Sequence, residues 1–137
     1  MELIPKYRAW LPTLQWMCSV STILFDENSV DVYKMGDTER VTEMSVNQDE
    51  VILMQSTGLL DKNDTEIFEG DVVRFSHLYG YPFDGFLNRV TWDEHNAAFK
   101  LVPLDKTWSD TYFSNFEEDT LKILEVVGNV YERKGYL

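Results

Sequence analysis

Short apolar and aromatic runs, separated by polar turn formers, recur along the first half of the chain. These runs are residues 7–10, 16–20, 22–25, 30–33 and 51–54. They are rich in β-branched and aromatic residues, which favour pleated, half-buried positions. The polar cluster at 26–29 predicts a hairpin turn between two of the runs. The run at 51–54 has a length that favours a strand over a helix.

Two stretches interrupt this pattern. Residues 34–47 show no firm period and include Gly36, so we expect a loop with room for one short strand near Val41. Residues 55–71 are dense in Asp, Asn, Lys and Thr between Gly58 and Gly70. That composition predicts tight turns and a connection rather than a core element.

The strand pattern returns from residue 72 onward. The expected strands cover residues 72–75, 86–92, 97–102, 108–113, 121–127 and 130–131. Pro103 closes one strand because proline cannot donate to a ladder, and Gly128 marks a bend or bulge. Residues 114–117 have the Ser-x-x-Glu form of a capping box, which predicts a helical turn over 115–120. Short strands at this spacing predict a small closed or nearly closed β-barrel.

The expected architecture is mostly β with a minor α+β character. It has an N-terminal β-rich lobe at 1–56, a connecting segment at 57–71 and a small β-barrel at 72–137. Two separate halves of a 137-residue chain would each be marginally stable. We therefore expect the parts to pack on each other or on neighbouring subunits.

Charge is the strongest compositional signal. The chain has 24 acidic and 12 basic side chains, which gives a net charge of −12. A negative field keeps a protein soluble and repels phosphate backbones and anionic lipid surfaces. Nucleic-acid affinity comes from counterion release by Lys and Arg. We therefore expect no direct nucleic-acid binding and no membrane binding.

Cys18 is the only cysteine, so an internal disulfide cannot form, which fits a reducing compartment. Its neighbours Trp16 and Val20 are typical of an inert buried thiol.

The N-terminus has no charged start followed by an apolar stretch, and no apolar run approaches the roughly 20 residues of a membrane span. We expect a cytoplasmic protein.

Candidate catalytic and metal-binding residues are scarce. An EF-hand loop starting at Asp61 would need Gly and Glu where Glu66 and Val72 stand. His77 and His95 have no Cys or His partner at zinc-ligand spacing. The chain contains no nucleophile elbow, phosphate-binding loop or dinucleotide fingerprint. We therefore expect no enzymatic activity, no metal and no cofactor.

The segment from His77 to Phe86 carries the clearest candidate for binding. Tyr79, Tyr81 and Phe83 recur at every second residue and would share one face of an extended segment. Intervening Gly and Pro residues favour an exposed loop, and aromatic clusters are typical of interface hot spots. The predicted partner-binding residues are Tyr79, Tyr81, Phe83 and Phe86. Two alternatives remain open, in which the rings cover the barrel's own core or stack on bases.

Three sequence motifs occur in order along the chain. The first is Lys-Tyr-Arg-Ala-Trp at 6–10. The second joins Gln-Ser-Thr-Gly-Leu-Leu-Asp-Lys-Asn at 55–63 to Glu-Ile-Phe-Glu-Gly-Asp-Val-Val at 66–73, and the third is Val-Gly-Asn-Val-Tyr-Glu at 127–132. Together with Val-Thr-Trp-Asp-Glu at 90–94, these motifs resemble the YopX family of phage and prophage proteins over nearly the whole chain.

The resemblance implies a Src-homology-3-like barrel joined to a smaller N-terminal lobe, and a family without an assigned activity. Leu11 departs from the family pattern, which usually has an acidic residue there. Asp64 replaces a glycine after Asn63, which weakens a simple Asn-Gly turn. We interpret the turn at 69–71 as one that defines the fold. Its glycine allows two backbone segments to approach closely, and the Asp side chain accepts local N–H bonds.

These observations favour a non-enzymatic phage or prophage accessory protein in the cytoplasm of the bacterial host. It would act through contacts with host or phage proteins, as a homo-oligomer. The alternative is an acidic DNA mimic that blocks a basic host protein, with phosphates imitated by acidic runs. These runs are Asp26-Glu27, Asp49-Glu50, Asp93-Glu94 and Glu117-Glu118-Asp119. An enzyme of unrecognised type is the third hypothesis.

Overall fold

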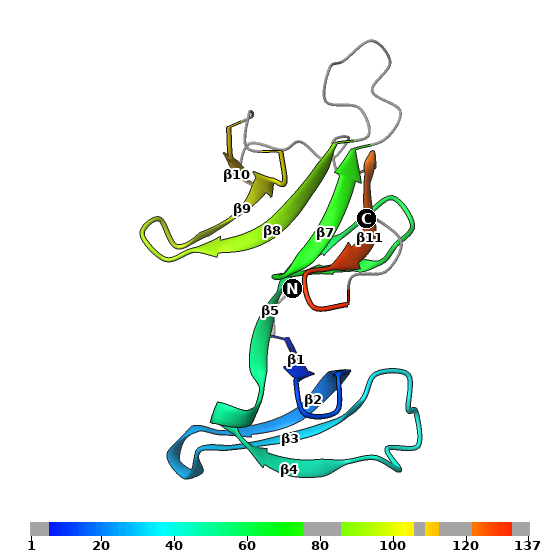
Figure 1. Ribbon diagram of the computed structural model, residues 1–137, viewed down its shortest axis with the longest axis vertical. Coiled ribbons are helices and arrows are strands. Elements are labelled where there is room, and N and C mark those ends of the chain that lie inside the picture. Colours follow the sequence, from blue (N-terminus) through cyan, green and yellow to red (C-terminus); the bar gives the residue numbers. More distant parts are fainter. Residues whose placement is uncertain (1–5, 76–85, 106–108, 113–121, 133–137) are drawn as a thin grey trace. The chain divides into compact units, whose positions relative to one another are not determined.

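The computed structural model describes residues 6–75, 86–105, 109–112 and 122–132 as antiparallel sheets and their connections (Figure 1). One sheet has the strand order β4-β3-β2-β1-β5-β6 and the other β10-β9-β8-β7-β11. The strands of the first sheet are β1 Tyr7–Leu11, β2 Trp16–Leu24, β3 Ser29–Lys34, β4 Met44–Asn47, β5 Ile52–Leu60 and β6 Glu66–Phe68. Those of the second are β7 Asp71–Phe75, β8 Leu87–Asp93, β9 Ala98–Pro103, β10 Thr111–Tyr112 and β11 Leu124–Asn129. The prediction of a mostly β protein is confirmed.

The chain divides into two compact units, Met1–Ser56 and Thr57–Leu137. Strand β5 passes through this division. In the first unit, the amide of Ser56 donates to the carbonyl of Lys6 at 2.8 Å, which ties β5 to the start of β1.

The predicted hairpin at 26–29 is present between β2 and β3. A short 3-10 turn, η1 Phe25–Glu27, is followed by Asn28 with φ of 53°. Asparagine tolerates this left-handed conformation better than most residues, so the chain reverses here and Leu24 pairs with Ser29. The register of β2 shifts between Val20 and Thr22, which marks a bulge.

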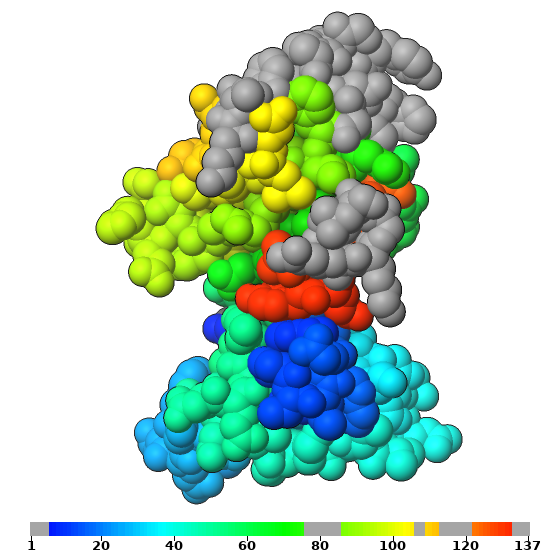
Figure 2. Space-filling view, in the orientation of Figure 1, coloured from blue at the N-terminus to red at the C-terminus, as the bar shows by residue number. Residues whose placement is uncertain are grey.

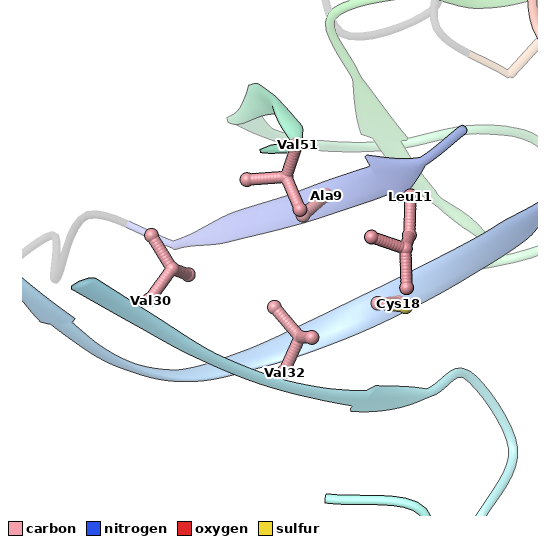
Figure 3. Close-up of a cluster of buried hydrophobic side chains, with 6 residues drawn as sticks. All are labelled: Ala9, Leu11, Cys18, Val30, Val32 and Val51. Atoms are coloured by element: carbon pink, nitrogen blue, oxygen red, sulfur yellow. The ribbon is translucent and has the colours of Figure 1, made fainter. Parts of the chain in front are cut away.

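The core of the first unit lies on one face of its sheet. Strand alternation places Ala9 and Cys18 opposite each other, and Val20 opposite Val32, on that face. The turn η2 Gln48–Glu50 leads into Val51, which completes the core. Figure 3 shows the cluster Ala9, Leu11, Cys18, Val30, Val32 and Val51. Each fully buried aliphatic side chain contributes about 1.5–3 kcal/mol.

The stretch at 55–71 is not the simple connection that its composition predicts. Strand β5 continues to Leu60, and β6 places Ile67 in the core of the second unit with no exposed surface. Gly58 has a positive φ, 77°, and lies within β5 rather than in a turn. The Thr57 hydroxyl donates to the carbonyl of Ile67 at 2.7 Å, so polar side chains here support a strand pair.

The stretch at 34–47 also differs from the prediction. The short strand is β4, and Val41 lies in the preceding loop with 80% of its surface exposed. The carboxylate of Asp37 accepts both the amide of Thr42 at 2.8 Å and its hydroxyl at 2.6 Å. These bonds hold the loop closed and lower the pKa of Asp37 below its ordinary value. The strand therefore starts after this loop, at Met44.

The second sheet packs its core against one face. Alternation brings Val73, Val90 and Leu101 to that face, together with Leu124 from β11. Gly128 lies at a register shift between β11 and β7, which confirms the predicted bulge. Pro103 ends β9, also as predicted.

The spacing predicts a closed or nearly closed barrel, and among the described residues the second sheet is not closed. Its edges are β10 and β11, and no ladder joins these two strands among the described residues. Strand β10 has only two residues, which is too short to extend the sheet far. The predicted helical turn at 115–120 lies outside the described residues. Of the predicted strand at 108–113, residues 109–112 are described, and Thr111–Tyr112 form β10.

Candidate interaction surface

The structure describes only the base of the predicted aromatic binding segment. Tyr79, Tyr81 and Phe83 lie outside the described residues, and Phe86 is half-buried just before β8. The amide of Phe75 donates to the carbonyl of Phe86 at 3.3 Å. The segment therefore leaves β7 and returns to β8 at two residues that are hydrogen-bonded to each other.

A third strand supports this base. Arg74 pairs with Leu87, and the amide of Leu104 donates to the carbonyl of Leu87 at 3.0 Å. The end of β7, the start of β8 and the residue after β9 are thus held together. A loop whose two ends are fixed in this way loses less conformational entropy when it binds a partner.

The central and closing motifs meet through the carboxylate of Asp61, which is 5% exposed. Its Oδ1 accepts the amides of Asn63 at 2.8 Å and Thr65 at 2.9 Å. Its Oδ2 accepts the amide of Val126 at 2.8 Å. The amide of Lys62 also donates to the carbonyl of Leu124 at 2.9 Å. Asp61 therefore orders the β5–β6 turn and fixes β11 to it.

The predicted role of the turn at 69–71 is confirmed. Gly70 has φ of 86°, and the carboxylate of Asp71 accepts the amide of Phe68 at 2.8 Å. The carbonyl of Gly70 accepts the amide of Val130 at 2.9 Å, while Asp71 pairs with Asn129. The turn between β6 and β7 is therefore bonded directly to the closing motif.

Asn129 completes the closing motif by ordering the chain after β11. Its Oδ1 accepts the amides of Tyr131 at 3.0 Å and Glu132 at 2.7 Å. Its Nδ2 donates to the carboxylate of Glu132 at 3.2 Å. The described parts of the second and third motifs therefore have structural roles in the second unit.

A polar network around Asp93 was not predicted. The Oδ2 of Asp93 accepts the hydroxyl of Tyr112 at 2.7 Å and the Nδ2 of Asn96 at 2.9 Å. Its Oδ1 accepts the amide of His95 at 3.0 Å, and His95 lies in the turn between β8 and β9. This network joins the β8–β9 turn to β10. The β8–β9 hairpin, yellow-green in Figure 2, reaches the surface of the second unit.

The chemistry of this network is that of a fixed hydrogen-bond acceptor. The bonds from Asn96 and Tyr112 lower the pKa of Asp93 to about 2. The bond to Asp93 raises the pKa of Tyr112. A carboxylate and a phenol with these shifts keep one protonation state across the neutral range, so the pair is poorly suited to general acid–base catalysis at neutral pH.

Metal-binding geometry is not found in the described part of the chain. No group of three His, Cys, Asp or Glu side chains there could hold a metal ion. Asp61, which opens the acidic stretch considered for calcium, has both oxygens occupied by backbone amides. His77 lies outside the described residues.

Cys18 is fully buried in the core of the first unit. Burial raises the pKa of its thiol above the ordinary value, so the reactive thiolate is disfavoured. This agrees with the predicted inert thiol.

Within the described residues, the structure contains no helix with the length and apolar character needed to span a membrane.

Comparison with known proteins gives a family and a structural relative. The chain matches the YopX protein family over residues 6–137. It is similar to the crystal structure of protein EF1440 from Enterococcus faecalis, with 26% sequence identity, a TM-score of 0.63 and 96% of each chain covered. No functionally curated protein matches the chain. The central and closing motifs, which are bonded together above, are thus part of a pattern that extends over nearly the whole sequence, and the chain belongs to the YopX family.

Proposed function

We propose that this chain is a non-enzymatic phage or prophage accessory protein of the bacterial cytoplasm that acts through protein–protein contacts. Its contact site is the aromatic segment with Tyr79, Tyr81 and Phe83, and it assembles as a homo-oligomer. The observation that carries the proposal is the hydrogen bond at the base of this segment. It joins Phe75 to Phe86 at the ends of two paired strands.

Two further features support this function. Alternating aromatic residues supply a large contact area at a low cost in side-chain entropy. The second is the Asp93–Tyr112 pair. The pKa of Asp93 is lowered to about 2, and its carboxylate is a fixed acceptor for the hydroxyl of Tyr112. Binding by a presented surface therefore fits this chain better than chemistry in a site.

A triple variant tests the contact site. Tyr79→Ser, Tyr81→Ser and Phe83→Ser together remove the three rings, and Phe25→Ser is the matched control because Phe25 is 71% exposed in the first unit. Light scattering after size-exclusion chromatography at micromolar concentration measures the assembly. We expect an oligomeric wild type, a monomeric triple variant and an oligomeric Phe25→Ser variant. A monomeric wild type, or an unchanged triple variant, would refute the proposal.

A second function, mimicry of DNA by an acidic surface, is favoured by one observation. The exposed acidic pairs on η1 and η2 belong to neighbouring turns, since the amide of Gln48 donates to the carbonyl of Asn28 at 3.0 Å. Asp93 is not available for direct contact with a basic partner, because it is buried and its carboxylate accepts internal hydrogen bonds.

The mimic hypothesis is tested with a variant that neutralises Asp26, Glu27, Asp49 and Glu50 as amides. Affinity capture from host lysate at low and high salt should recover a basic protein with the wild type and lose it with this variant. Recovery of no salt-sensitive basic protein would count against mimicry.

A further inference from the structure

The turn between β2 and β3 carries an aromatic side chain that the fold does not use. Phe25 begins η1 and is 71% exposed, and Leu24 just before it is exposed as well. Every other Phe, Tyr and Trp in the described ranges is buried or half-buried. Aromatic rings are enriched where proteins contact their partners, so Phe25 is a candidate contact residue of the first unit.

Four exposed carboxylates lie at the same end of the first unit as this ring, two on η1 and two on η2. The two turns are adjacent because the amide of Gln48 donates to the carbonyl of Asn28 at 3.0 Å. Ser29 also pairs with Asn47, which places both turns at one end of β3 and β4 (Figure 1). We name this set the acidic aromatic patch, which consists of Phe25, Asp26, Glu27, Asp49 and Glu50.

The carboxylates of the patch make no ion pair with any residue that the structure describes. The cations of the first unit are placed elsewhere. Lys34 and Arg40 belong to the opposite end of β3, and Arg8 is buried. Lys6 precedes β1, whose ladder with β2 reaches no further toward the hairpin end than Ser19. The patch therefore presents negative charge that this unit does not neutralise.

The first unit itself shows what a ring and a carboxylate bind together. The guanidinium of Arg40 lies over the Tyr33 ring at 4.7 Å, and its Nη1 lies 3.7 Å from Glu43 Oε2. The face of an aromatic ring attracts a cation, and a carboxylate accepts two parallel N–H bonds from a guanidinium. The acidic aromatic patch presents the same two kinds of group, with no described cation between them.

We propose that the acidic aromatic patch is a docking site for an arginine-containing basic segment of a partner protein. One arginine of the segment stacks on the Phe25 ring, and its guanidinium and those of its neighbours bind the carboxylates of η1 and η2. The inference deepens the second function proposed above, on which it rests for a basic partner protein. It adds what that partner presents, and it does not depend on the aromatic segment at 79–83.

Charge selects this occupant over the others. A second copy of the chain has a net charge of −12 and would bring like charges to the patch. Phosphate backbones and anionic lipid surfaces are repelled for the same reason. Arginine fits better than lysine, because its planar guanidinium stacks on a ring while it donates in parallel to a carboxylate.

The ring is tested with a variant that leaves the charge unchanged. Binding of fluorescein-labelled octaarginine and octalysine to the full chain is measured by fluorescence anisotropy at about 0.15 M salt, where distant charges are screened. Phe25→Leu keeps an apolar side chain and removes the aromatic face. We expect it to weaken octaarginine binding about threefold, the loss of one exposed cation–π contact. The preference for octaarginine over octalysine should shrink with it.

The carboxylates are tested with two matched double variants. Asp26→Asn with Glu27→Gln removes two charges from the patch, and Glu39→Gln with Glu94→Gln removes two exposed charges outside it. We expect the first pair to weaken octaarginine binding about fivefold and the second less than about twofold. Thermal unfolding of each variant checks that these exposed substitutions leave the fold intact.

Several outcomes would overturn the proposal. They are no binding of octaarginine by the wild type, unchanged binding by Phe25→Leu, and an equal loss for the two double variants, which would show a general charge effect. A monomeric Phe25→Ser variant in light scattering would instead assign the ring to a second copy.

The arginine site and mimicry of DNA fail in different experiments. Recovery of a basic host protein by the wild type and by Phe25→Leu alike would support mimicry and refute the arginine site. Phe25-dependent binding of octaarginine, with no salt-sensitive basic protein recovered from host lysate, would support the arginine site and count against mimicry.

Discussion

The carboxylate of Asp61 accepts the backbone amide of Val126 at 2.8 Å, across 65 residues of sequence. The same carboxylate holds the turn between β5 and β6 through two further amides. One buried side chain therefore connects the central motif of the family to β11.

Replacing Asp61 with alanine should strongly destabilise the second unit. The change leaves three backbone N–H groups without their acceptor. Each unsatisfied buried donor costs about 1–3 kcal/mol, so we expect a loss of at least about 3 kcal/mol. Asp61→Asn should cost less, because its single oxygen can still accept. Urea unfolding measures the change, with Asp26→Ala in η1 as the control expected to stay within about 0.5 kcal/mol.

Restoring a glycine at position 64 should stabilise the protein. Asp64 has φ of 62°, a left-handed conformation that a glycine adopts without steric cost. We expect Asp64→Gly to gain about 0.5 kcal/mol and Asp64→Ala to lose about as much. The order of stability should be Gly above Asp above Ala in urea unfolding. An alanine variant more stable than the glycine variant would contradict the backbone argument.

The Asp93–Tyr112 bond should stabilise the fold only between two pH limits. The folded-state pKa of Asp93 is about 2, below its ordinary value of about 4. Its contribution is therefore present above about pH 4 and lost as pH falls through about 2. The pKa of Tyr112 is raised, so its contribution is present below its ordinary pKa of about 10 and lost as pH rises through the folded value.

Tyr112→Phe should accordingly lower the Tm at pH 7, and the difference from wild type should shrink toward both extremes. Differential scanning calorimetry across the pH range measures this. Tyr33→Phe is the control, because the contact described for Tyr33 is with Arg40 through its ring. A Tm difference for Tyr112→Phe that is constant with pH would show that the hydrogen bond is not the cause.

The thiol of Cys18 should be protected in the native protein. It is fully buried among apolar side chains, and its raised pKa disfavours the thiolate. We expect a thiol reagent to react at least about a hundredfold more slowly with the native protein than with the unfolded chain. Cys18→Ser should cost about 1–3 kcal/mol because a hydroxyl replaces a small apolar group in the core. Rapid labelling under native conditions would contradict this placement.

Much of the fold could be predicted from local pattern. The turn residues at 26–29 and the alternation in β8 and β9 are signals that arise within one strand or one hairpin. The strands within the stretch at 55–71 were not predicted, because a polar side chain of β5 bonds to the backbone of β6. Thr57 is an example, since its hydroxyl bonds across to Ile67. Composition alone assigns such residues to a turn.

The polar sites could not be predicted because they depend on register between strands. Tyr112 reaches Asp93 only because β10 pairs with β9. The acidic pairs of η1 and η2 are far apart in sequence, and the pairing of β3 with β4 brings the two turns together. A partial signal was present, since Asp26-Glu27 and Asp49-Glu50 each stand out as acidic pairs in the sequence.

The β7–β11 ladder has a consequence for synthesis on the ribosome. Strand β11 is the last of the described strands, whereas β1 to β4 lie within the first 56 residues. The first unit can begin to fold early, because domains fold from the N-terminus as they emerge. The second must wait with one edge of β7 unpaired until Leu124 to Asn129 have left the exit tunnel. During that interval the nascent chain exposes a strand edge that other chains can pair with.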